Sequence, residues 1–166
     1  RPVVETGKRI VVGFKPEAYA AAFPGSLWQG CPLSFFHEKI LLETGGGLAN
    51  VQHVFRDDGP FFVYNGDVFT DLPLAPAMER HLSDGNLVTL ILRSQGPVRN
   101  VAMDAGSRRI LDLRNARGTH HPDQYQFTGL CIIDPAFFRY LPPAGAIESV
   151  VAAWLRAIEA GERLGG

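Results

Sequence analysis

The sequence predicts an α/β fold from three patterns. Short apolar runs alternate along the chain with longer stretches of helical periodicity, which is typical of strands joined by crossover helices. The run from Phe61 to Tyr64 is apolar at every position, as expected of a strand in a parallel sheet that is covered on both faces. From Ile147 to Ile158 the apolar residues recur at the spacing of one helix face.

The first part of the chain is predicted to form three strands and two helices. The strand from Phe61 to Tyr64 is expected at the centre of the sheet, because both of its faces need covering. In chain order the elements are a strand at Arg9 to Phe14, a helix beginning at Pro16, a strand at Leu33 to Phe36, a helix at about Gly47 to Phe55, and the strand at Phe61 to Tyr64.

The second part begins with another helix and strand and then changes character. Three shorter strands separated by turns favour a small antiparallel or mixed patch rather than another crossover unit. The chain is then expected to close with a helix whose apolar stripe belongs to the core and which ends at Gly161. The expected elements are a helix at Pro73 to Leu82, strands at Leu87 to Leu92, Val98 to Met103, Ile110 to Leu113 and Gln126 to Ile133, and the helix from Ile147 to Ile158.

The composition is that of one folded domain, here residues 1–166. Of the 166 residues, 46% are hydrophobic and 20% charged, which suffices for a single core. A net charge of -1 and the absence of a Lys/Arg run argue against nucleic-acid binding. No apolar run is long enough to cross a bilayer, and residues 1–5 lack the apolar region of a signal peptide, so we expect a cytoplasmic protein.

The cysteines and histidines do not indicate a metal centre. Cys31 and Cys131 lie in different apolar segments, and two buried free thiols are favoured over a disulfide. No two histidines are spaced to share a helix face with a carboxylate, so a zinc site is not expected.

A glycine-rich segment, ETGGGL, occupies residues 43–48 and leads toward a predicted helix. Its three glycines allow close backbone approach to a ligand, and a helix N-terminus offers unpaired N–H groups to an anion. The alternative is a flexible turn that requires positive φ. The spacing matches neither a dinucleotide fingerprint nor a P-loop.

A second segment, FFVYNGD, delivers Asp67 at the end of an apolar strand. At that edge of an open α/β sheet a carboxylate is placed to hold a hard cation and, through it, a phosphate. The alternative is a β-hairpin, because Asn-Gly is a strong hairpin signal. The strand does not alternate, however, and residues 68–73 do not form a matched return strand, which argues against the hairpin.

Three motifs together resemble the sugar-1-phosphate nucleotidyltransferases: ETGGGL, FFVYNGDVFTDL and YQFTGLCIIDP. The resemblance extends from about Arg9 to the C-terminus. Within the family, the sequence looks most like the uridylyltransferases for N-acetylmuramate 1-phosphate and the guanylyltransferases for mannose 1-phosphate. It implies a nucleotide-diphospho-sugar transferase fold, a three-layer α/β/α sandwich with a mainly parallel sheet. It also implies a nucleoside triphosphate and a sugar 1-phosphate as substrates and Mg²⁺ as cofactor.

The resemblance also implies roles for individual residues. Asp67 corresponds to a magnesium ligand and catalytic residue. The other implied residues bind the nucleotide and the sugar, and these are Glu43, Thr44, Gly45, Gly46, Gly47, Asn65, Gly66, Thr128 and Gly129. For the last two the alternatives are structural: Thr128 as a strand residue satisfied by its neighbours and Gly129 as a bulge.

The implied reaction is in-line attack of the sugar-phosphate oxygen on the α-phosphorus of the nucleoside triphosphate, with pyrophosphate leaving. Two anions must be brought together, so magnesium and cationic groups are expected to neutralise charge while the cleft aligns the substrates. No covalent intermediate is required, which agrees with the absence of a Ser/His/Asp or Cys/His grouping.

The sequence departs from the family at three places. It lacks the first glycine loop of the type Gly-x-Gly-Thr-Arg-x-x-Pro with its Pro-Lys-Pro segment, and it lacks the later Trp-x-Asp-x-Gly motif that supplies a second magnesium ligand. The Glu-Lys-Pro segment that contacts the sugar phosphate is replaced by the neighbourhood of Arg114 and Arg117, where an arginine could substitute and a solvated loop is the alternative. We therefore expect a fragment or degenerate copy with weak or no activity alone.

Two rival functions remain. The chain could be a non-catalytic nucleotide-sugar-binding or regulatory module. Magnesium-dependent nucleotide binding that is lost in Asp67→Ala would support the enzyme-derived site, and no binding at all would favour a structural or interaction role. A glycosyltransferase is disfavoured, because Asp67 and Asp71 do not form an Asp-x-Asp motif. The sequence leaves the base, the sugar and the oligomeric state open, with a homo-oligomer among the alternatives.

Overall fold

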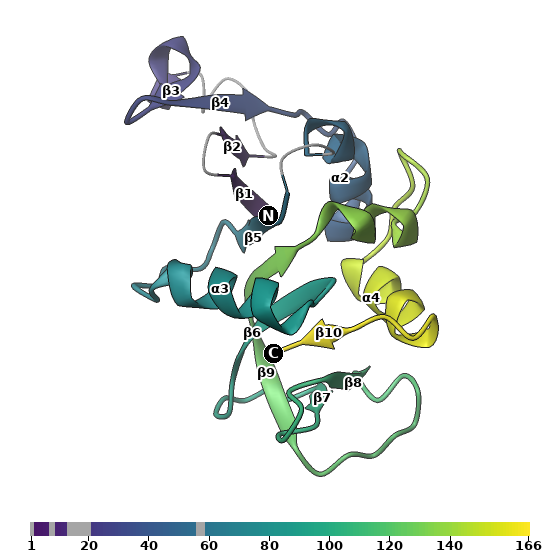
Figure 1. The fold of residues 1–166 in the computed structure, drawn as a ribbon. Helices are drawn as coiled ribbons and strands as arrows, with labels where there is room; N and C mark the ends of the chain where they lie inside the picture. The colour runs from purple at the N-terminus through teal and green to yellow at the C-terminus, as the bar shows by residue number, and fades with distance from the viewer. Residues whose placement is uncertain (1, 7–8, 13–20, 56–58) are drawn as a thin grey trace.

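The computed structural model describes residues 2–6, 9–12, 21–55 and 59–166 (Figure 1). The strands are β1 Pro2–Thr6, β2 Arg9–Val12, β3 Leu27–Trp28, β4 Cys31–Phe35, β5 Phe61–Asn65, β6 Val88–Arg93, β7 Val101–Met103, β8 Ile110–Leu113, β9 Gln124–Ile133 and β10 Leu164–Gly165. The α-helices are α2 Glu43–Val51, α3 Leu74–Asp84 and α4 Val150–Glu159, with short 3₁₀ turns η1 Pro24–Ser26, η2 Gln52–Val54 and η3 Pro135–Tyr140.

The strands of the described residues form one mixed sheet. Its order is β10-β6-β9-β5-β1-β2-β4-β3, and β7 pairs with β8 and β9 beside this path. Only β10–β6 and β2–β4 pair in parallel among the named strands, while β9 runs antiparallel to β5 and β6 on its two sides. The expected mainly parallel sheet is therefore not confirmed. An all-apolar strand shows that both faces are covered but carries no information about the direction of its neighbours.

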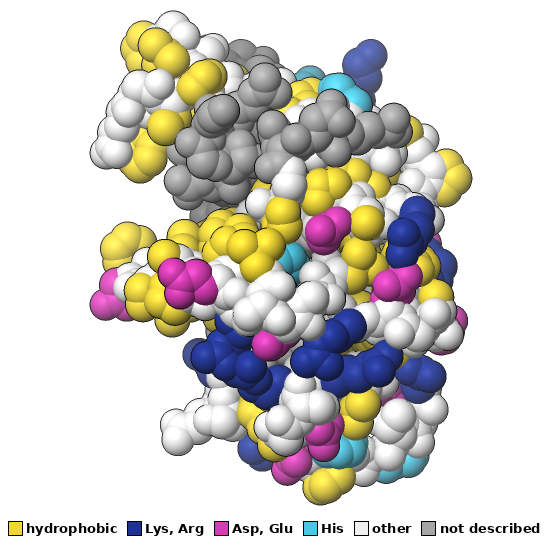
Figure 2. All heavy atoms as spheres, in the orientation of Figure 1, with side chains coloured by type: hydrophobic (Ala, Val, Ile, Leu, Met, Phe, Trp, Pro, Cys, Tyr) yellow, Lys and Arg dark blue, Asp and Glu magenta, His cyan; other side chains and the backbone are white. Residues whose placement is uncertain are grey.

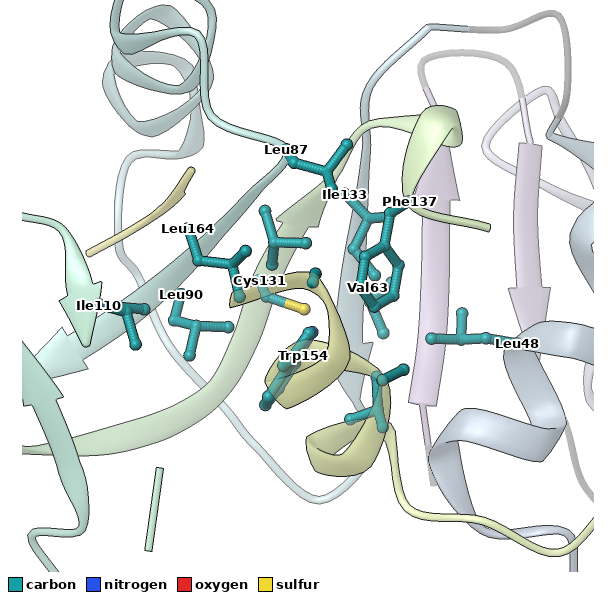
Figure 3. Close-up of a cluster of buried hydrophobic side chains, with 14 of the residues drawn as sticks. Leu48, Val63, Leu87, Leu90, Ile110, Cys131, Ile133, Phe137, Trp154 and Leu164 are labelled. Carbon is teal, nitrogen blue, oxygen red and sulfur yellow. The ribbon is translucent and has the colours of Figure 1, made fainter. Parts of the chain in front are cut away.

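One face of the sheet packs against α2 and α4. Val63 of β5 lies opposite Cys131 of β9, which lies opposite Leu90 of β6, so the three side chains share a face. They belong to a buried cluster with Leu48 of α2 and Trp154 of α4 (Figure 3). This cluster is the main core of the described chain, and it lies directly beneath the pocket discussed below.

The other face packs against α3. Thr89 of β6 lies opposite Ile132 of β9, and both are buried. His81 of α3 reaches this face, where its Nδ1 lies 2.9 Å from Thr89 Oγ1. Helices therefore cover both faces, with α3 on one side and α2 and α4 on the other, which gives the three layers that were expected (Figure 1).

Most expected elements lie within a few residues of their predicted places. β5 occupies an interior position between β9 and β1, and β7, β8 and β9 form the antiparallel patch. The helix expected at Pro16 lies outside the described residues. The last helix begins at Val150 after the cap residue Ser149, so Ile147 precedes it and is 61% exposed rather than part of the core stripe.

Both cysteines of the chain are free thiols, as expected, but only Cys131 is buried, since Cys31 is partly exposed. No helix in the described part of the chain combines the length and apolar character needed to span a membrane.

The burial of His81 predicts a pH-dependent stability. Burial lowers the pKa of His81, and the nearby charge of Asp134 opposes this effect without reversing it. The unfolded chain therefore binds more protons than the folded chain as pH falls below about 6.5, so stability should fall there, by at most about 1.4 kcal/mol per pH unit. Urea unfolding at pH 7.5 and 5.5 measures this slope, and His81→Gln should flatten it. His37→Gln changes an exposed histidine and should leave the slope unchanged; a slope equal in all three proteins would contradict the assignment.

Candidate functional site

The turn after β5 presents Asp67 to solvent. Asn65 ends the strand, and the backbone N–H of Val68 donates to Asn65 O at 3.1 Å, which closes a turn with Gly66 and Asp67 at its centre. The next element is the helix α3 and not a return strand, so the hairpin alternative is excluded. Asp67 is exposed, and its carboxylate has no hydrogen-bond or ion-pair partner among the described residues.

This turn closes onto β9 at Gly129. Gly129 has φ 90°, and a Cβ there would lie 2.9 Å from both Asn65 Nδ2 and Val68 Cγ2. The absence of a side chain therefore lets the turn approach the strand. Beside it, Thr128 Oγ1 donates to Ile91 O at 2.8 Å, within the register shift between Leu90 and Leu92 of β6. Its hydroxyl thus adds a hydrogen bond at the place where the ladder is irregular.

The glycine-rich segment is part of helix α2 and not a turn before it. Among its residues, Glu43 starts the helix with φ 58° and is exposed, while the three glycines are buried. A Cβ on Gly46 would lie 2.1 Å from Ala146 O, and one on Gly45 would lie 2.6 Å from Glu148 O. These two glycines therefore bring the helix against the backbone of residues 146–149.

The expected helix start at Gly47 was wrong by four residues. Glycine inside a helix costs about 1 kcal/mol relative to alanine, which favours a turn when the segment is considered alone. The structure offsets this cost by hydrogen bonds from Gly46 N to Glu148 O (3.0 Å) and from Glu148 N to Leu42 O (3.1 Å). Only the folded chain supplies that neighbouring segment.

A pocket of about 190 Å³ lies where these elements meet. The first turn of α2, the end of β5, the middle of β9, the loop after β8 and the start of α4 all contribute to it. Its lining residues are Thr44, Leu48, Val63, Asn65, Arg114, Phe127, Gly129, Cys131, Ser149, Val150, Val151 and Trp154. Arg114 is the single charged side chain in this lining.

The apolar wall of the pocket offers no nucleophile. Phe127 and Trp154 meet edge to face, with ring centroids 5.4 Å apart. Burial raises the pKa of the Cys131 thiol to about 12, so this thiol stays protonated at neutral pH. The wall can exclude water and hold a ring, but Cys131 is not an activated nucleophile.

The donor set suits a magnesium ion shared with phosphates better than a metal held by protein alone. Within the described ranges, no three His, Cys, Asp or Glu side chains are grouped as metal ligands. Asp67 supplies one exposed carboxylate that has no hydrogen-bond or ion-pair partner in the described part of the chain. Mg²⁺ is commonly bound through one or two carboxylates, water and substrate phosphates, so this single carboxylate fits that mode of binding.

The pocket brings together some of the residues predicted from the sequence and not others. Thr44, Asn65 and Gly129 line it, and Gly66 and Asp67 follow Asn65 in the adjoining turn. The remaining predicted residues are not part of the lining, and these are Glu43, Gly45, Gly46, Gly47 and Thr128.

Eight lining residues were not predicted for the site, and these are Leu48, Val63, Phe127, Cys131, Ser149, Val150, Val151 and Trp154. Phe127 directly precedes the Thr-Gly pair, which is a signal that could have been noticed. The periodicity of the last helix placed Trp154 in the core, which is correct, but did not indicate that the core forms the pocket wall. Arg114 was considered only as a candidate substitute.

Other basic side chains gather in a band below α3 (Figure 2). At the end of α3, Arg108 Nη2 pairs with Asp84 Oδ2 at 3.1 Å. Arg109 Nη2 donates to the carbonyl oxygens of Gly161 and Glu162 at 3.0 and 3.2 Å. These two arginines bind the C-terminal end of α3 and the segment after α4, and neither is part of the pocket lining.

Comparison with known proteins identifies relatives of one kind. Over 94 residues the chain is 34% identical to a mannose-1-phosphate guanylyltransferase of Mycobacterium tuberculosis, covering 55% of this chain and 26% of the relative. It is 31% identical over 84 residues to the catalytic subunit beta of the Dictyostelium discoideum enzyme, covering 50% and 23%. The matches thus span about a quarter of each curated relative. No protein-family model matches the chain.

Solved structures share the fold. HddC from Yersinia pseudotuberculosis superposes with a TM-score of 0.69 at 16% identity, covering 95% of this chain and 68% of that one. A UDP-glucose pyrophosphorylase complexed with UDP-glucose gives 0.67 at 12% identity, covering 95% and 72%. The relatives and the pyrophosphorylase are sugar-1-phosphate nucleotidyltransferases, which confirms the resemblance drawn from the three motifs and the nucleotide-diphospho-sugar transferase fold.

The packing of the glycines in α2 predicts whether an alanine substitution lowers or raises the stability of the protein. Gly46→Ala should lower the free energy of unfolding by about 1–3 kcal/mol, because the new Cβ would overlap Ala146 O. If the glycine instead faced open space, alanine would stabilise the helix by up to about 1 kcal/mol. Chemical denaturation measures the difference. Gly106→Ala is the matched control, since a Cβ there meets only Asp104 Oδ1 at 3.7 Å, and stabilisation by Gly46→Ala would refute the packing.

Proposed function

We propose that this chain is the central part of a sugar-1-phosphate nucleotidyltransferase, which joins a nucleoside monophosphate unit to a sugar 1-phosphate and releases pyrophosphate. The observation that carries the proposal is the pocket that joins Thr44, Asn65, Gly129 and Arg114 beside the turn bearing Asp67. The partial homology to mannose-1-phosphate guanylyltransferases supports the reaction class. The two substrates are proposed by class only: a nucleoside triphosphate and a hexose 1-phosphate.

In the proposed reaction a phosphate oxygen of the sugar 1-phosphate attacks the α-phosphorus of the triphosphate. A new P–O bond forms as the bond to the β-phosphate oxygen breaks, and the electron pair leaves with pyrophosphate. No group is oxidised or reduced. Because both reactants are anions, alignment and charge neutralisation are what the protein must supply.

The residues of the pocket divide these tasks. Arg114 is the cation of the lining and pairs with the phosphate of the sugar. Thr44 and Asn65 offer a hydroxyl and an amide to ligand oxygen atoms, and Gly129 leaves room for a ring against the strand. The Phe127 and Trp154 rings exclude water from this end of the pocket.

Asp67 is the residue that would hold Mg²⁺. When bound, the ion supplies charge neutralisation on the triphosphate and orients its oxygen atoms. The Asp67 carboxylate is exposed on a turn that the hydrogen bond from Val68 N to Asn65 O closes. A ligand can therefore reach it from solvent. The neighbouring Asp71 is also exposed but lies four residues further along, beyond the turn.

A non-catalytic nucleotide-sugar-binding or regulatory module is the second candidate. The observation that favours it is that, within the described residues, Asp67 is not accompanied by further acidic or histidine side chains that could complete a metal set. Both candidates require magnesium-dependent nucleotide binding, and only the enzyme releases pyrophosphate.

The test compares the wild-type chain with Asp67→Asn, which keeps the side-chain shape and removes the charge. Calorimetric titration with GTP and UTP in Mg²⁺ should show binding that EDTA abolishes, and Asp67→Asn should weaken it roughly 100-fold because a direct ligand is lost. Asp71→Asn is the control and should bind as the wild type does.

Pyrophosphate release with mannose 1-phosphate is the second measurement. Release that depends on Mg²⁺ and on Asp67 identifies the enzyme, while binding without release fits both the module and an enzyme fragment with weak or no activity alone. Equal binding by the wild type and Asp67→Asn would overturn the assignment of Asp67 in either case.

A further inference from the structure

The loop that carries Arg114 is held in an uncommon backbone conformation. Arg114 has φ 56° and Asn115 has φ 53°, so two consecutive residues with side chains occupy the left-handed region. This region is unfavourable for a residue with a side chain, although asparagine tolerates it better than arginine does. Such conformations persist only when the surroundings hold them, and they concentrate at functional sites.

The group that holds this loop is the carboxylate of Asp112 on β8. Asp112 is 0% exposed and is the only acidic side chain in the buried part of the described chain. Its Oδ1 accepts hydrogen bonds from Leu113 N at 2.7 Å and Arg117 N at 3.1 Å. Its Oδ2 accepts from Arg117 N at 3.1 Å, Thr119 N at 3.3 Å and Thr119 Oγ1 at 3.1 Å.

The carboxylate is kept ionised by these donors. Burial alone raises the pKa of Asp112, but the backbone hydrogen bonds from Arg117, Thr119 and Leu113 outweigh it and hold the pKa below its ordinary value. A charged, buried acceptor can therefore gather several N–H groups of one loop around a single point.

Further bonds tie the backbone of the loop while leaving one side chain unbound. Arg114 N donates to Asn100 O at 2.6 Å, and His120 N donates to Asn115 Oδ1 at 3.0 Å. Arg117 Nη1 donates to Leu111 O at 3.3 Å. The guanidinium of Arg114 has no hydrogen-bond or ion-pair partner within the described ranges, and Arg114 is an exposed residue of the pocket lining.

We propose that Asp112 is a positioning residue for phosphate recognition: it holds the left-handed turn at residues 114–115 so that Arg114 faces the pocket. This inference rests on the proposed function, because the phosphate is that of the sugar 1-phosphate. Holding the cation in place before the ligand arrives removes part of the ordering cost of binding. Arg114 contacts the ligand, and Asp112 acts only through Arg114.

The experiment measures the binding of mannose 1-phosphate to the wild-type chain and to three single variants. Arg114→Gln removes the cation, Asp112→Asn removes the buried charge, and Thr119→Val removes one donor from the loop with little change in volume. ³¹P NMR titration reports the dissociation constant and the chemical-shift change of the bound phosphate. We expect about tenfold weaker binding for Arg114→Gln, a similar loss for Asp112→Asn, and a smaller loss for Thr119→Val.

The double variant Asp112→Asn with Arg114→Gln separates positioning from general damage. If Asp112 acts through Arg114, the double variant should bind no more weakly than Arg114→Gln alone. A merely structural role would add a further loss in the Arg114→Gln background. Far-UV circular dichroism checks that each variant is folded, and Thr119→Val keeps the test decisive if Asp112→Asn does not fold.

The failures of the two proposals are distinguishable. Additive losses, or binding by Thr119→Val equal to that of the wild type, would overturn the role of Asp112 and leave the proposed function standing. Failure of the wild-type chain to bind mannose 1-phosphate, glucose 1-phosphate and N-acetylmuramate 1-phosphate at millimolar concentration would overturn both.

Discussion

Strand β9 is hydrogen-bonded on both edges, to β5 and to β6, and the pocket depends on how closely the turn after β5 can approach it. At Gly129 a single Cβ would meet Asn65 and Val68, so the contact exists only because this residue lacks a side chain. On the β6 side the register shifts, and there Thr128 donates a hydrogen bond to Ile91 O. One irregular place in a strand thus shapes the floor of the pocket and fixes the turn that carries Asp67.

The opposite wall depends on a second close approach. Helix α2 can lie against residues 146–149 because Gly45 and Gly46 have no side chains on that side. The same contact brings Thr44 of α2 and Ser149, the cap of α4, to one pocket. Arg156 of α4 secures the segment further by bonds to Glu148 and to Tyr140 O. In both walls glycine allows two parts of the chain to pack closely, and the pocket lies between these two contacts.

Few charged residues lie at the pocket. Asp67 stands on the exposed turn and Arg114 on the loop after β8, while the wall between them is apolar or neutral. A raised thiol pKa removes Cys131 from consideration as a nucleophile. Such a site suits a reaction in which two anionic substrates react directly with each other, since the protein then contributes alignment and charge neutralisation and no covalent step.

The sequence by itself determined the interior strand β5, the turn bearing Asp67, the α4 stripe around Trp154 and the antiparallel patch, because each is encoded in the spacing of neighbouring residues. It also carried the family resemblance. Only the tertiary structure decided that the glycines face residues 146–149, that β9 runs antiparallel between β5 and β6, that Ile147 lies outside the core, and that Asp112 gathers the loop of Arg114. The first two of these depend on partners distant in the chain, and local periodicity does not say what a buried residue is buried against. Ile147 lies outside the core because the helix begins only at Val150. Asp112 meets donors that follow it closely in the chain, but their convergence depends on a backbone turn that periodicity does not describe.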